Sequence, residues 1–221
     1  MNVEQARFNM IEQQIRPWNV LDGQVLDLLG TVRREDFVPV AHRALAFSDL
    51  ELPLRGQGEQ GQCMLAPRVE ARMLQDLALR PDDRVLEIGA GSGYMAALMA
   101  HRAQHVLTLE IVPELVSLAR TNLQRAGITN VEVRQADGAH GASTDGPFDV
   151  IVLSGSVAEV PADLLQQLKV GGRLMAIVGE GPMMRATRMR RASDTQFESL
   201  QGWDTVAPRL LNFAEASRFR F

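Results

Sequence analysis

The spacing of apolar residues predicts three helices in the first third of the chain. Residues 3–16 carry apolar side chains near helical spacing, and Asp22 is a suitable N-cap for a second helix. Pro67 suits the first turn of a third helix that runs to about Leu79. The predicted buried positions are Val3, Ala6, Met10, Ile11 and Ile15, then Val25, Leu26 and Leu29, and finally Val69, Met73, Leu74 and Leu77.

The second half of the chain alternates between short apolar runs and helical patterns. The predicted strands are 84–88, 105–109, 131–134, 148–153 and 173–178, and the helices between them are 94–101, 113–125 and 161–168. Strands separated by helices of this length predict a parallel, doubly wound sheet. After Gly181 the pattern changes, and residues 183–192 and 207–219 predict two strands of an antiparallel hairpin at one edge of the sheet.

The predicted fold class is therefore α/β: a doubly wound, mostly parallel seven-stranded Rossmann-like sheet with an antiparallel edge hairpin and N-terminal helices. The 221 residues fit one domain, 1–221, and 46% of them are apolar, enough to bury a core. A net charge of −4 argues against bulk attraction to nucleic acid or to an anionic membrane. We expect a cytoplasmic protein, because the chain has no basic, apolar leader at its start and no apolar run long enough to span a membrane.

A glycine-rich loop follows the first predicted strand and opens a helix. Its glycines are Gly89, Gly91 and Gly93, in the spacing G-x-G-x-G, which differs from the G-x-G-x-x-G of dinucleotide enzymes and from the phosphate-binding P-loop. Glu87 stands two residues before the first glycine, where a carboxylate suits a cationic ligand better than a pyrophosphate. An ordinary tight turn with an incidental glutamate is the alternative.

Two further acids follow neighbouring strands. Glu110 ends the second predicted strand, where a carboxylate can accept from ribose hydroxyls, and Asp137 follows the third, where it can accept from an adenine amino group. The carboxyl ends of parallel strands share one edge of the sheet, so these acids and the glycine loop predict a site for S-adenosylmethionine. Without this grouping, each acid would be interpreted as a solvated strand end. A nicotinamide-dependent dehydrogenase is disfavoured by the glycine spacing and by Glu87.

Several stretches resemble those of the protein-L-isoaspartate O-methyltransferase family, over most of the chain from about Leu21 to about Phe213. The motifs that carry the resemblance are 32–38 (Val-Arg-Arg-Glu-Asp-Phe-Val), 60–67, 84–94, 136–138, 147–149 and 171–174. The resemblance implies an enzyme that uses S-adenosylmethionine to methylate the carboxylate of L-isoaspartyl residues in damaged proteins, as a step of repair. Such a carboxylate is already ionised at neutral pH, so positioning rather than a general base should carry catalysis. The catalytic residue is left unknown.

The resemblance also implies roles for particular residues. Within the domain it places N-terminal helices and a substrate loop in 1–66, a cofactor-binding core in 67–180 and C-terminal strands in 181–221. The expected cofactor-binding residues are Glu87, Ile88, Gly89, Ala90, Gly91, Gly93, Tyr94, Glu110, Ile111, Asp137 and Gly138. The expected substrate-binding residues are Gln62, Cys63, Met64, Leu65 and Pro67.

The substrate loop departs from the family pattern. The family reads Gly-Gln-Thr-Ile-Ser-Gln-Pro where this chain has Gly61-Gln-Cys-Met-Leu-Ala-Pro67. Leu65 replaces the serine and cannot donate a hydrogen bond, and Cys63 replaces the threonine. Two alternatives therefore stand beside isoaspartyl methylation: a methyltransferase of the same architecture with a different substrate, and a non-catalytic S-adenosylmethionine-binding protein.

The remaining candidate features favour structural interpretations. Cys63 is the only cysteine, so no internal disulfide forms, and a catalytic thiol is a minor alternative because no basic residue is its neighbour in sequence. The four histidines lack metal-ligand spacing, and no metal site is expected. The basic run of residues 185–191 is typical of a solvated edge strand, with a contact for acidic substrates or nucleic acid as the alternative. A protein or peptide partner is expected as substrate, and the oligomeric state is left open.

Overall fold

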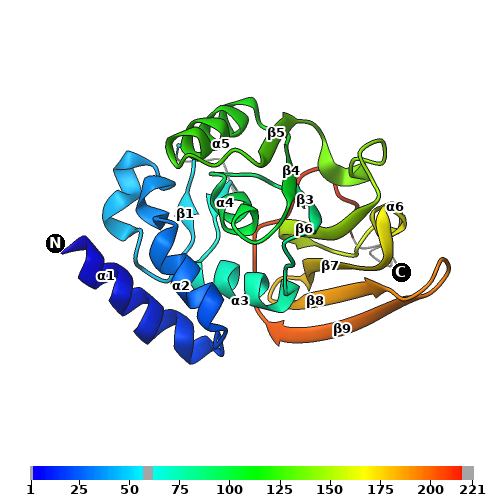
Figure 1. Cartoon of the computed structure of the whole chain (residues 1–221), viewed down its shortest axis with the longest axis horizontal. Helices are drawn as coiled ribbons and strands as arrows, with labels where there is room; N and C mark the ends of the chain where they lie inside the picture. The colour runs from blue at the N-terminus through cyan, green and yellow to red at the C-terminus, as the bar shows by residue number, and fades with distance from the viewer. Residues whose placement is uncertain (1, 57–61, 216–221) are drawn as a thin grey trace, which may run out of the picture.

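Residues 2–56 and 62–215 are described in the computed structural model. Figure 1 shows a twisted central sheet with helices packed against it and the N-terminal helices grouped at one side. The helices are α1 (Val3–Met10), α2 (Gly23–Thr31), α3 (Pro67–Leu77), α4 (Tyr94–Ala100), α5 (Pro113–Arg125) and α6 (Ala162–Gln166). The strands are β1 (Leu52–Pro53), β2 (Cys63–Met64), β3 (Arg84–Ile88), β4 (His105–Glu110), β5 (Val131–Gln135), β6 (Phe148–Val157), β7 (Leu168–Glu180), β8 (Met183–Arg191) and β9 (Phe197–Asp204).

Seven of the described strands form one sheet in the order β5-β4-β3-β6-β7-β8-β9. The first five are parallel neighbours, and β8 and β9 pair antiparallel to β7 and to each other. The predicted mostly parallel sheet with an antiparallel edge is thus confirmed. Because β3 is the middle one of the five parallel strands and its neighbours β4 and β6 run parallel to it, the loops that leave these three strands meet at one edge of the sheet.

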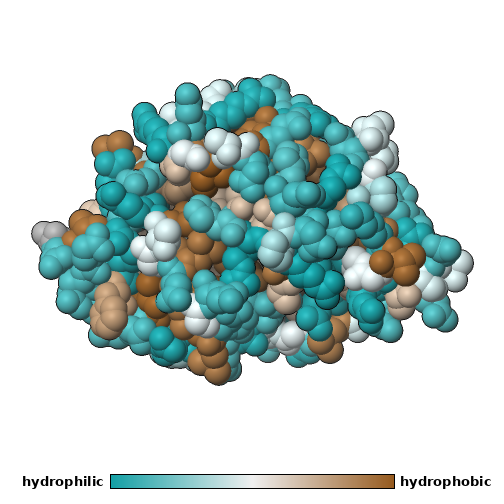
Figure 2. Space-filling view, in the orientation of Figure 1, coloured by the Kyte–Doolittle hydropathy of each residue, from teal (hydrophilic) through white to brown (hydrophobic). Residues whose placement is uncertain are grey.

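Alternation along the strands divides the core into two layers. Val85, Val106 and Val150 pack with the helices α1 to α5, whereas Leu86, Leu107 and Ile151 pack with α6 on the opposite face. Period-two alternation of side chains explains this division. The second layer is thinner, since its helical cover within the described chain is α6 and the short 3-10 helix Gly138–His140. Figure 2 shows one face of the molecule as mostly hydrophilic, with apolar side chains gathered in the hollow between α5 and the N-terminal helices.

The N-terminal segment is helical as predicted, but its geometry changes along its length. After α1 it continues as a π-helical turn, Ile11–Ile15, and a 3-10 turn, Arg16–Trp18. The side chain of Asn2 caps its start by accepting from the amide of Gln5. The side chain of Asp22 caps α2 as predicted, accepting from the amides of Gln24 and Val25.

Of the strand predicted at 207–219, the described part 207–215 is not a strand, and residues 216–219 lie outside the described residues. The second hairpin strand is β9 (Phe197–Asp204), reached from β8 by a tight turn at 192–196. The side chains of β9 are mostly exposed and polar because it is an edge strand, so they give little apolar alternation to detect. Pro208 also lacks the amide hydrogen that a regular ladder needs.

Residues 205–213, called here the C-terminal segment, instead cross the sheet edge beside β6. The amide of Ser156 donates to the carbonyl of Pro208 at 2.7 Å, and the amide of Leu210 donates to the carbonyl of Ser156 at 2.9 Å. The hydroxyl of Ser156 donates to the carbonyl of Ala207 at 2.8 Å. These bonds hold the segment over the carboxyl end of β6, the edge at which the predicted site lies.

Two smaller features complete the fold. Residues 50–66 contain the short antiparallel pair β1-β2, and residues 57–61 lie outside the described residues. Among residues 2–56 and 62–215, no helix combines the length and the apolar character needed to cross a membrane.

Candidate cofactor and substrate site

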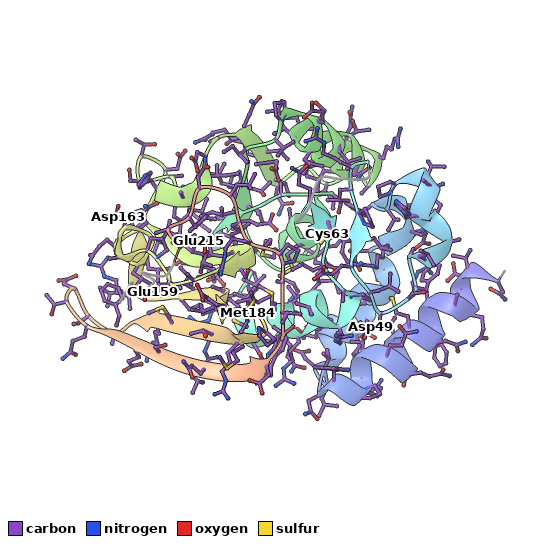
Figure 3. The ribbon with its side chains drawn as sticks, turned by 180° about the vertical axis from the view of Figure 1, so that it is seen from behind. Asp49, Cys63, Glu159, Asp163, Met184 and Glu215 are labelled. Carbon is purple, nitrogen blue, oxygen red and sulfur yellow. The ribbon has the colours of Figure 1, made fainter. Side chains whose placement is uncertain are left out.

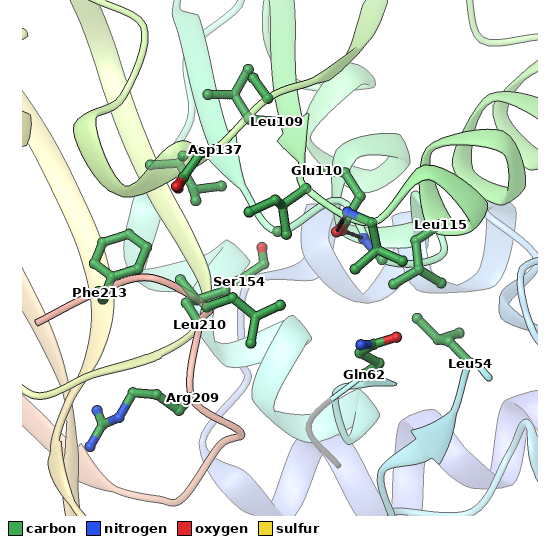
Figure 4. Close-up of a pocket in the computed structure, with 18 of the residues that line it drawn as sticks. Leu54, Gln62, Leu109, Glu110, Leu115, Asp137, Ser154, Arg209, Leu210 and Phe213 are labelled. Atoms are coloured by element: carbon green, nitrogen blue, oxygen red, sulfur yellow. Dashed lines mark hydrogen bonds between the residues drawn. The ribbon is translucent and has the colours of Figure 1, made fainter. Parts of the chain in front are cut away.

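A pocket opens at the carboxyl ends of β3, β4 and β6 (Figure 4). Its empty space is about 610 Å³ when the solvent at its open mouth is included. Its lining includes Ile88, Gly89, Gly91, Glu110, Ile111, Asp137 and Gly138, all of them predicted cofactor-binding residues. Gln62 and Cys63 of the predicted substrate loop line it as well. The fold therefore brings most of the predicted cofactor-binding residues and two of the five predicted substrate-binding residues to one cavity.

The glycine loop has the backbone geometry that the motif predicts. Gly89, Gly91 and Gly93 have φ of 95°, 53° and 82°, in the left-handed region that favours glycine. A methyl group on Gly89 would lie 3.0 Å from a side-chain carbon of Leu210, so the C-terminal segment packs directly on this loop. The loop thus presents bare backbone to the pocket and to α5.

Glu110 is the acid most firmly built into the pocket wall. It is 6% exposed, and its two carboxylate oxygens accept from the amides of Gly91 at 2.9 Å and Val112 at 3.0 Å. A carboxylate has about four acceptor positions, so two remain for a ligand. Glu110 therefore orients the glycine loop and can also accept from a pair of vicinal hydroxyls in the pocket.

Asp137 lies at the other end of the pocket and is exposed. One carboxylate oxygen caps the 3-10 helix Gly138–His140 by accepting from the amide of Ala139 at 3.0 Å. The other accepts from the side-chain amide of Asn212, in the C-terminal segment, at 2.7 Å. Figure 4 shows Phe213 and Leu210 of that segment near Asp137. This end of the pocket combines an acceptor with apolar walls, as an adenine ring requires.

Glu87 lies behind the glycine loop and does not line this pocket. Its carboxylate is fully buried and accepts from the hydroxyls of Thr108 and Ser154, both at 2.7 Å. Burial raises the pKa of Glu87 to about 7, although both hydrogen bonds oppose the shift. Ser154 lines the pocket and donates to Glu87, so it links the two.

A smaller chamber of about 290 Å³ adjoins the pocket beneath the substrate loop. The two cavities share Cys63, Gly89, Gly91 and Ser154 as lining residues. The chamber is otherwise lined by Met64, Leu65, Glu70, Glu87, Ala90, Ser92, Tyr94 and Met95. The predicted cofactor-binding residues Ala90 and Tyr94 thus lie at this chamber, together with Glu87, and Gly93 lines neither cavity.

The side chains of the substrate loop differ in their exposure and in the cavity that they line. The side-chain oxygen of Gln62 accepts from Arg55 at 3.0 Å beside the pocket mouth. Met64 and Leu65 are 3% and 6% exposed and belong to the apolar core, so the leucine side chain is largely withdrawn from solvent. Pro67 is the first residue of α3 and lines neither cavity.

Cys63 is a poor nucleophile in this setting. Its thiol lies 3.6 Å from the carboxylate of Glu51, and burial together with that carboxylate raises its pKa to about 12. Figure 3 shows Cys63 where the N-terminal part of the chain meets the sheet. The catalytic-thiol alternative is therefore unsupported, since the reactive thiolate is disfavoured at neutral pH.

Sequence reasoning missed ten of the residues that line the pocket: Leu54, Leu109, Val112, Leu115, Ala136, Ser154, Arg209, Leu210, Leu211 and Phe213. Leu54 lies at the mouth, Ser154 at the junction of the cavities, and Leu210 and Phe213 on the C-terminal segment. Leu210 and Phe213 were not predicted as pocket residues because residues 207–219 were predicted to form a strand. Ser154 is the first residue after the predicted strand 148–153, which is the neighbour of β3 in the sheet. This place at the end of a strand beside β3 was the signal that could have identified it.

The protein-family comparison agrees with this geometry. Residues 5–206 match the model of the family described as protein-L-isoaspartate(D-aspartate) O-methyltransferase. The chain is 41% identical over 198 residues to protein-L-isoaspartate O-methyltransferase 2 of Marinobacter nauticus, and the match covers 89% of each chain. The chain belongs to this family.

Other family members extend the similarity. The Koribacter versatilis protein-L-isoaspartate O-methyltransferase is 36% identical, with 91% of this chain and 93% of that protein covered. A solved protein-L-isoaspartate O-methyltransferase superposes with a TM-score of 0.77 at 26% identity, over 92% of this chain and 66% of the other. A Plasmodium falciparum structure described as a beta-aspartate methyltransferase, in complex with S-adenosyl-L-homocysteine, has a TM-score of 0.76 at 20% identity over 95% and 99% of the chains, which supports the fold alone.

Proposed function

We propose that this chain transfers the methyl group of S-adenosylmethionine to the carboxylate of L-isoaspartyl residues in proteins or peptides. The observation that carries the proposal is the membership in the protein-L-isoaspartate(D-aspartate) O-methyltransferase family over residues 5–206. The relatives with 41% and 36% identity bear the name of that activity. The pocket at the carboxyl edge of the sheet supplies the chemistry that such a reaction needs.

The pocket residues fit S-adenosylmethionine. Glu110 retains two acceptor positions toward the pocket, where the ribose hydroxyls would bind. The exposed Asp137, beside the apolar Leu210 and Phe213, would receive the adenine ring. The close backbone of Gly89 and Gly91 leaves room for the remainder of the molecule, with Glu87 and Ser154 behind it. When bound, this molecule supplies an electrophilic methyl group on a sulfonium.

The chain's own part in the reaction is positioning. An acceptor carboxylate is ionised at neutral pH, since a free aspartyl carboxyl has a pKa of about 3.9. It therefore needs no base, only an in-line approach to the methyl group with water excluded. Gln62 and Cys63 stand where such an acceptor enters, because both border the pocket beside Leu54. Proteins and peptides are the acceptor class that this open mouth would admit.

The proposal is tested by methyl transfer to an isoaspartyl peptide, with the matched aspartyl peptide as the control acceptor. We expect incorporation of the methyl group into the isoaspartyl peptide only, and loss of incorporation when S-adenosyl-L-homocysteine is added in excess. Equal incorporation into both peptides, or none into either at high enzyme concentration, would reject isoaspartyl specificity.

One observation favours a second candidate, a methyltransferase with a different and less polar acceptor. The substrate loop has no hydroxyl at Cys63 or Leu65, and the side chain of Leu65 packs in the core. A Leu65→Ser variant then serves as the discriminating protein. If the parent is inactive on the isoaspartyl peptide and the variant is active, the missing hydroxyl sets the specificity. Equal activity of the two proteins would show that Leu65 does not select the acceptor.

A further inference from the structure

Arg34 is a cation buried completely between the two loops of the site. Its side chain is 0% exposed, and it forms an ion pair with Glu70, in the first turn of α3. It also donates to the carbonyl oxygen of Leu65 at 2.7 Å and to that of Ala46 at 3.1 Å. Its guanidinium carbon lies 5.3 Å from the centroid of the Tyr94 ring. All of these partners come from different segments of the chain.

Two of the contacts reach the site directly. Leu65 belongs to the substrate loop, and Tyr94 is the first residue of α4, immediately after the last glycine of the glycine loop. Both residues line the small chamber that the two loops enclose. The ring of Phe37 packs edge-on against Tyr94 at 5.3 Å between centroids, so Tyr94 is fixed from a second side.

A buried ion pair is weak evidence for a role in stability, because burying two charges costs about as much as their attraction returns. An apolar pair of the same volume would fill this space as well. What an arginine adds is a rigid planar fork that can bond three acceptors at once and stack on an aromatic ring. That geometry suits a residue that fixes several segments relative to one another.

We propose that Arg34 is a positioning residue that fixes the substrate loop relative to the glycine loop, through Leu65 on one side and Tyr94 on the other. The inference rests on the proposed function for the identity of the two loops. Arg34 lies in the motif Val32–Val38, to which the proposed chemistry gives no other role. The guanidinium of Arg34 thereby fixes the position of the loop backbone without touching either the acceptor or the methyl donor.

Arg7 provides a matched control within the same chain. Its side chain is 5% exposed and forms an ion pair with the buried Glu35, and its guanidinium carbon lies 5.9 Å from the centroid of the Phe47 ring. Arg7, Glu35 and Phe47 line neither cavity. Arg7→Lys therefore makes the same chemical change in a similar buried environment, away from both loops.

The test compares Arg34→Lys and Arg7→Lys with the parent in two measurements. The first is the rate at which iodoacetamide alkylates Cys63, the only cysteine, which lies two residues from Leu65. We expect Arg34→Lys to raise this rate by at least about fivefold, because a lysine cannot replace the fork and the loop then opens locally. Arg7→Lys should leave it within about twofold of the parent.

The second measurement separates acceptor turnover from cofactor affinity. We expect Arg34→Lys to lower kcat/KM for the isoaspartyl peptide by about tenfold to a hundredfold, as small misplacements do. The Kd for S-adenosyl-L-homocysteine, measured by calorimetry, should change by less than about threefold, because the cofactor acids keep their own partners. Arg7→Lys should change neither quantity.

The two measurements distinguish the possible failures. If the parent does not methylate the peptide, the proposed function fails, and Cys63 alkylation still decides the role of Arg34. Equal alkylation rates for the two variants at matched thermal stability would overturn the positioning role. If Arg34→Lys does not fold, Glu70→Gln replaces it, because it removes the charge that orients Arg34 and keeps a similar shape. An unchanged Cys63 rate in folded Glu70→Gln would then overturn the proposal.

Discussion

Glu110 binds the backbone of the glycine loop: its carboxylate accepts from the amide of Gly91 at 2.9 Å. The two residues lie on neighbouring strand ends, Glu110 closing β4 and Gly91 following β3. The same carboxylate that would receive ribose hydroxyls therefore also shapes the loop that the cofactor contacts. Loss of its charge should affect the loop and the ligand together.

Glu110→Gln should weaken cofactor binding more than it weakens the fold. The glutamine offers one acceptor oxygen instead of two, so it cannot satisfy Gly91, Val112 and two hydroxyls at once. We expect the Kd for S-adenosyl-L-homocysteine to rise by about tenfold to a hundredfold, which corresponds to the loss of one or two hydrogen bonds to a charged acceptor. Calorimetry measures the change. Glu132→Gln, at an exposed position of β5, is the control and should leave the Kd unchanged. A similar Kd for both variants would contradict the role of Glu110.

Asn212→Ala should also weaken cofactor binding, through Asp137. The asparagine side chain holds one oxygen of Asp137 at 2.7 Å and ties the C-terminal segment to the pocket. Without it the carboxylate gains rotational freedom and the apolar wall of Leu210 and Phe213 loosens. We expect a rise in Kd of about threefold to tenfold, equivalent to about 1 kcal/mol. Equilibrium dialysis with S-adenosyl-L-homocysteine checks this. Val206→Ala, in the same segment, 52% exposed and outside the pocket lining, is the comparison, and a larger effect there would contradict the prediction.

The stability of the protein should depend on pH through Glu87. Burial raises its pKa from 4.5 to about 7 in the folded state, so between these values the folded protein holds a proton that the unfolded chain has released. The stabilisation from this carboxyl is therefore complete below about pH 4.5 and is lost as the pH rises toward 7. Glu87→Gln removes the dependence, while the like-charged neighbours Glu70 and Glu110 remain in both proteins.

Urea denaturation at pH 5 and pH 8 measures this effect. The quantity compared is the free energy of unfolding of Glu87→Gln minus that of the parent. We expect this difference to be larger at pH 8 than at pH 5 by on the order of 1–3 kcal/mol, because only the parent loses the contribution of Glu87. Thr108→Val removes one hydrogen bond that lowers the pKa of Glu87, so it should raise that pKa further and extend the loss of stability to higher pH. A relative stability that is the same at pH 5 and pH 8 would show that Glu87 does not titrate in this range.

The sequence was informative where local rules act. Glycine spacing, strand order and the acids at strand ends follow from period-two alternation and from the need for left-handed backbone, so Gly89, Glu110 and Asp137 could be placed before the structure was known. The exposed strand β9 could not, because an edge strand with few apolar residues has a weak pattern. The partners of Arg34 were also beyond local rules, since Glu70 lies 36 residues further along the chain. Such contacts are fixed by packing between segments.

The last prediction concerns the third glycine of the motif. Gly93 and Gly127 both have left-handed φ, 82° and 70°, but a methyl group on Gly93 would lie 3.3 Å from three atoms of Ala119 in α5, and one on Gly127 would meet nothing within 4 Å. Both alanine variants carry the cost of a left-handed alanine, about 1–2 kcal/mol. Gly93→Ala must in addition push α5 away from α4.

We therefore expect Gly93→Ala to lower the free energy of unfolding by about 1–3 kcal/mol more than Gly127→Ala does, since overpacking of a tight contact has that cost. Urea denaturation of the two variants gives the difference directly, and the shared backbone strain cancels in the comparison. Gly93→Ala should also raise the Kd for S-adenosyl-L-homocysteine, because a displaced α4 moves Gly91 and hence its bond to Glu110. Equal destabilisation by the two variants would mean that the close approach to Ala119 is relieved without cost, and that the glycine at 93 is required for its backbone conformation alone.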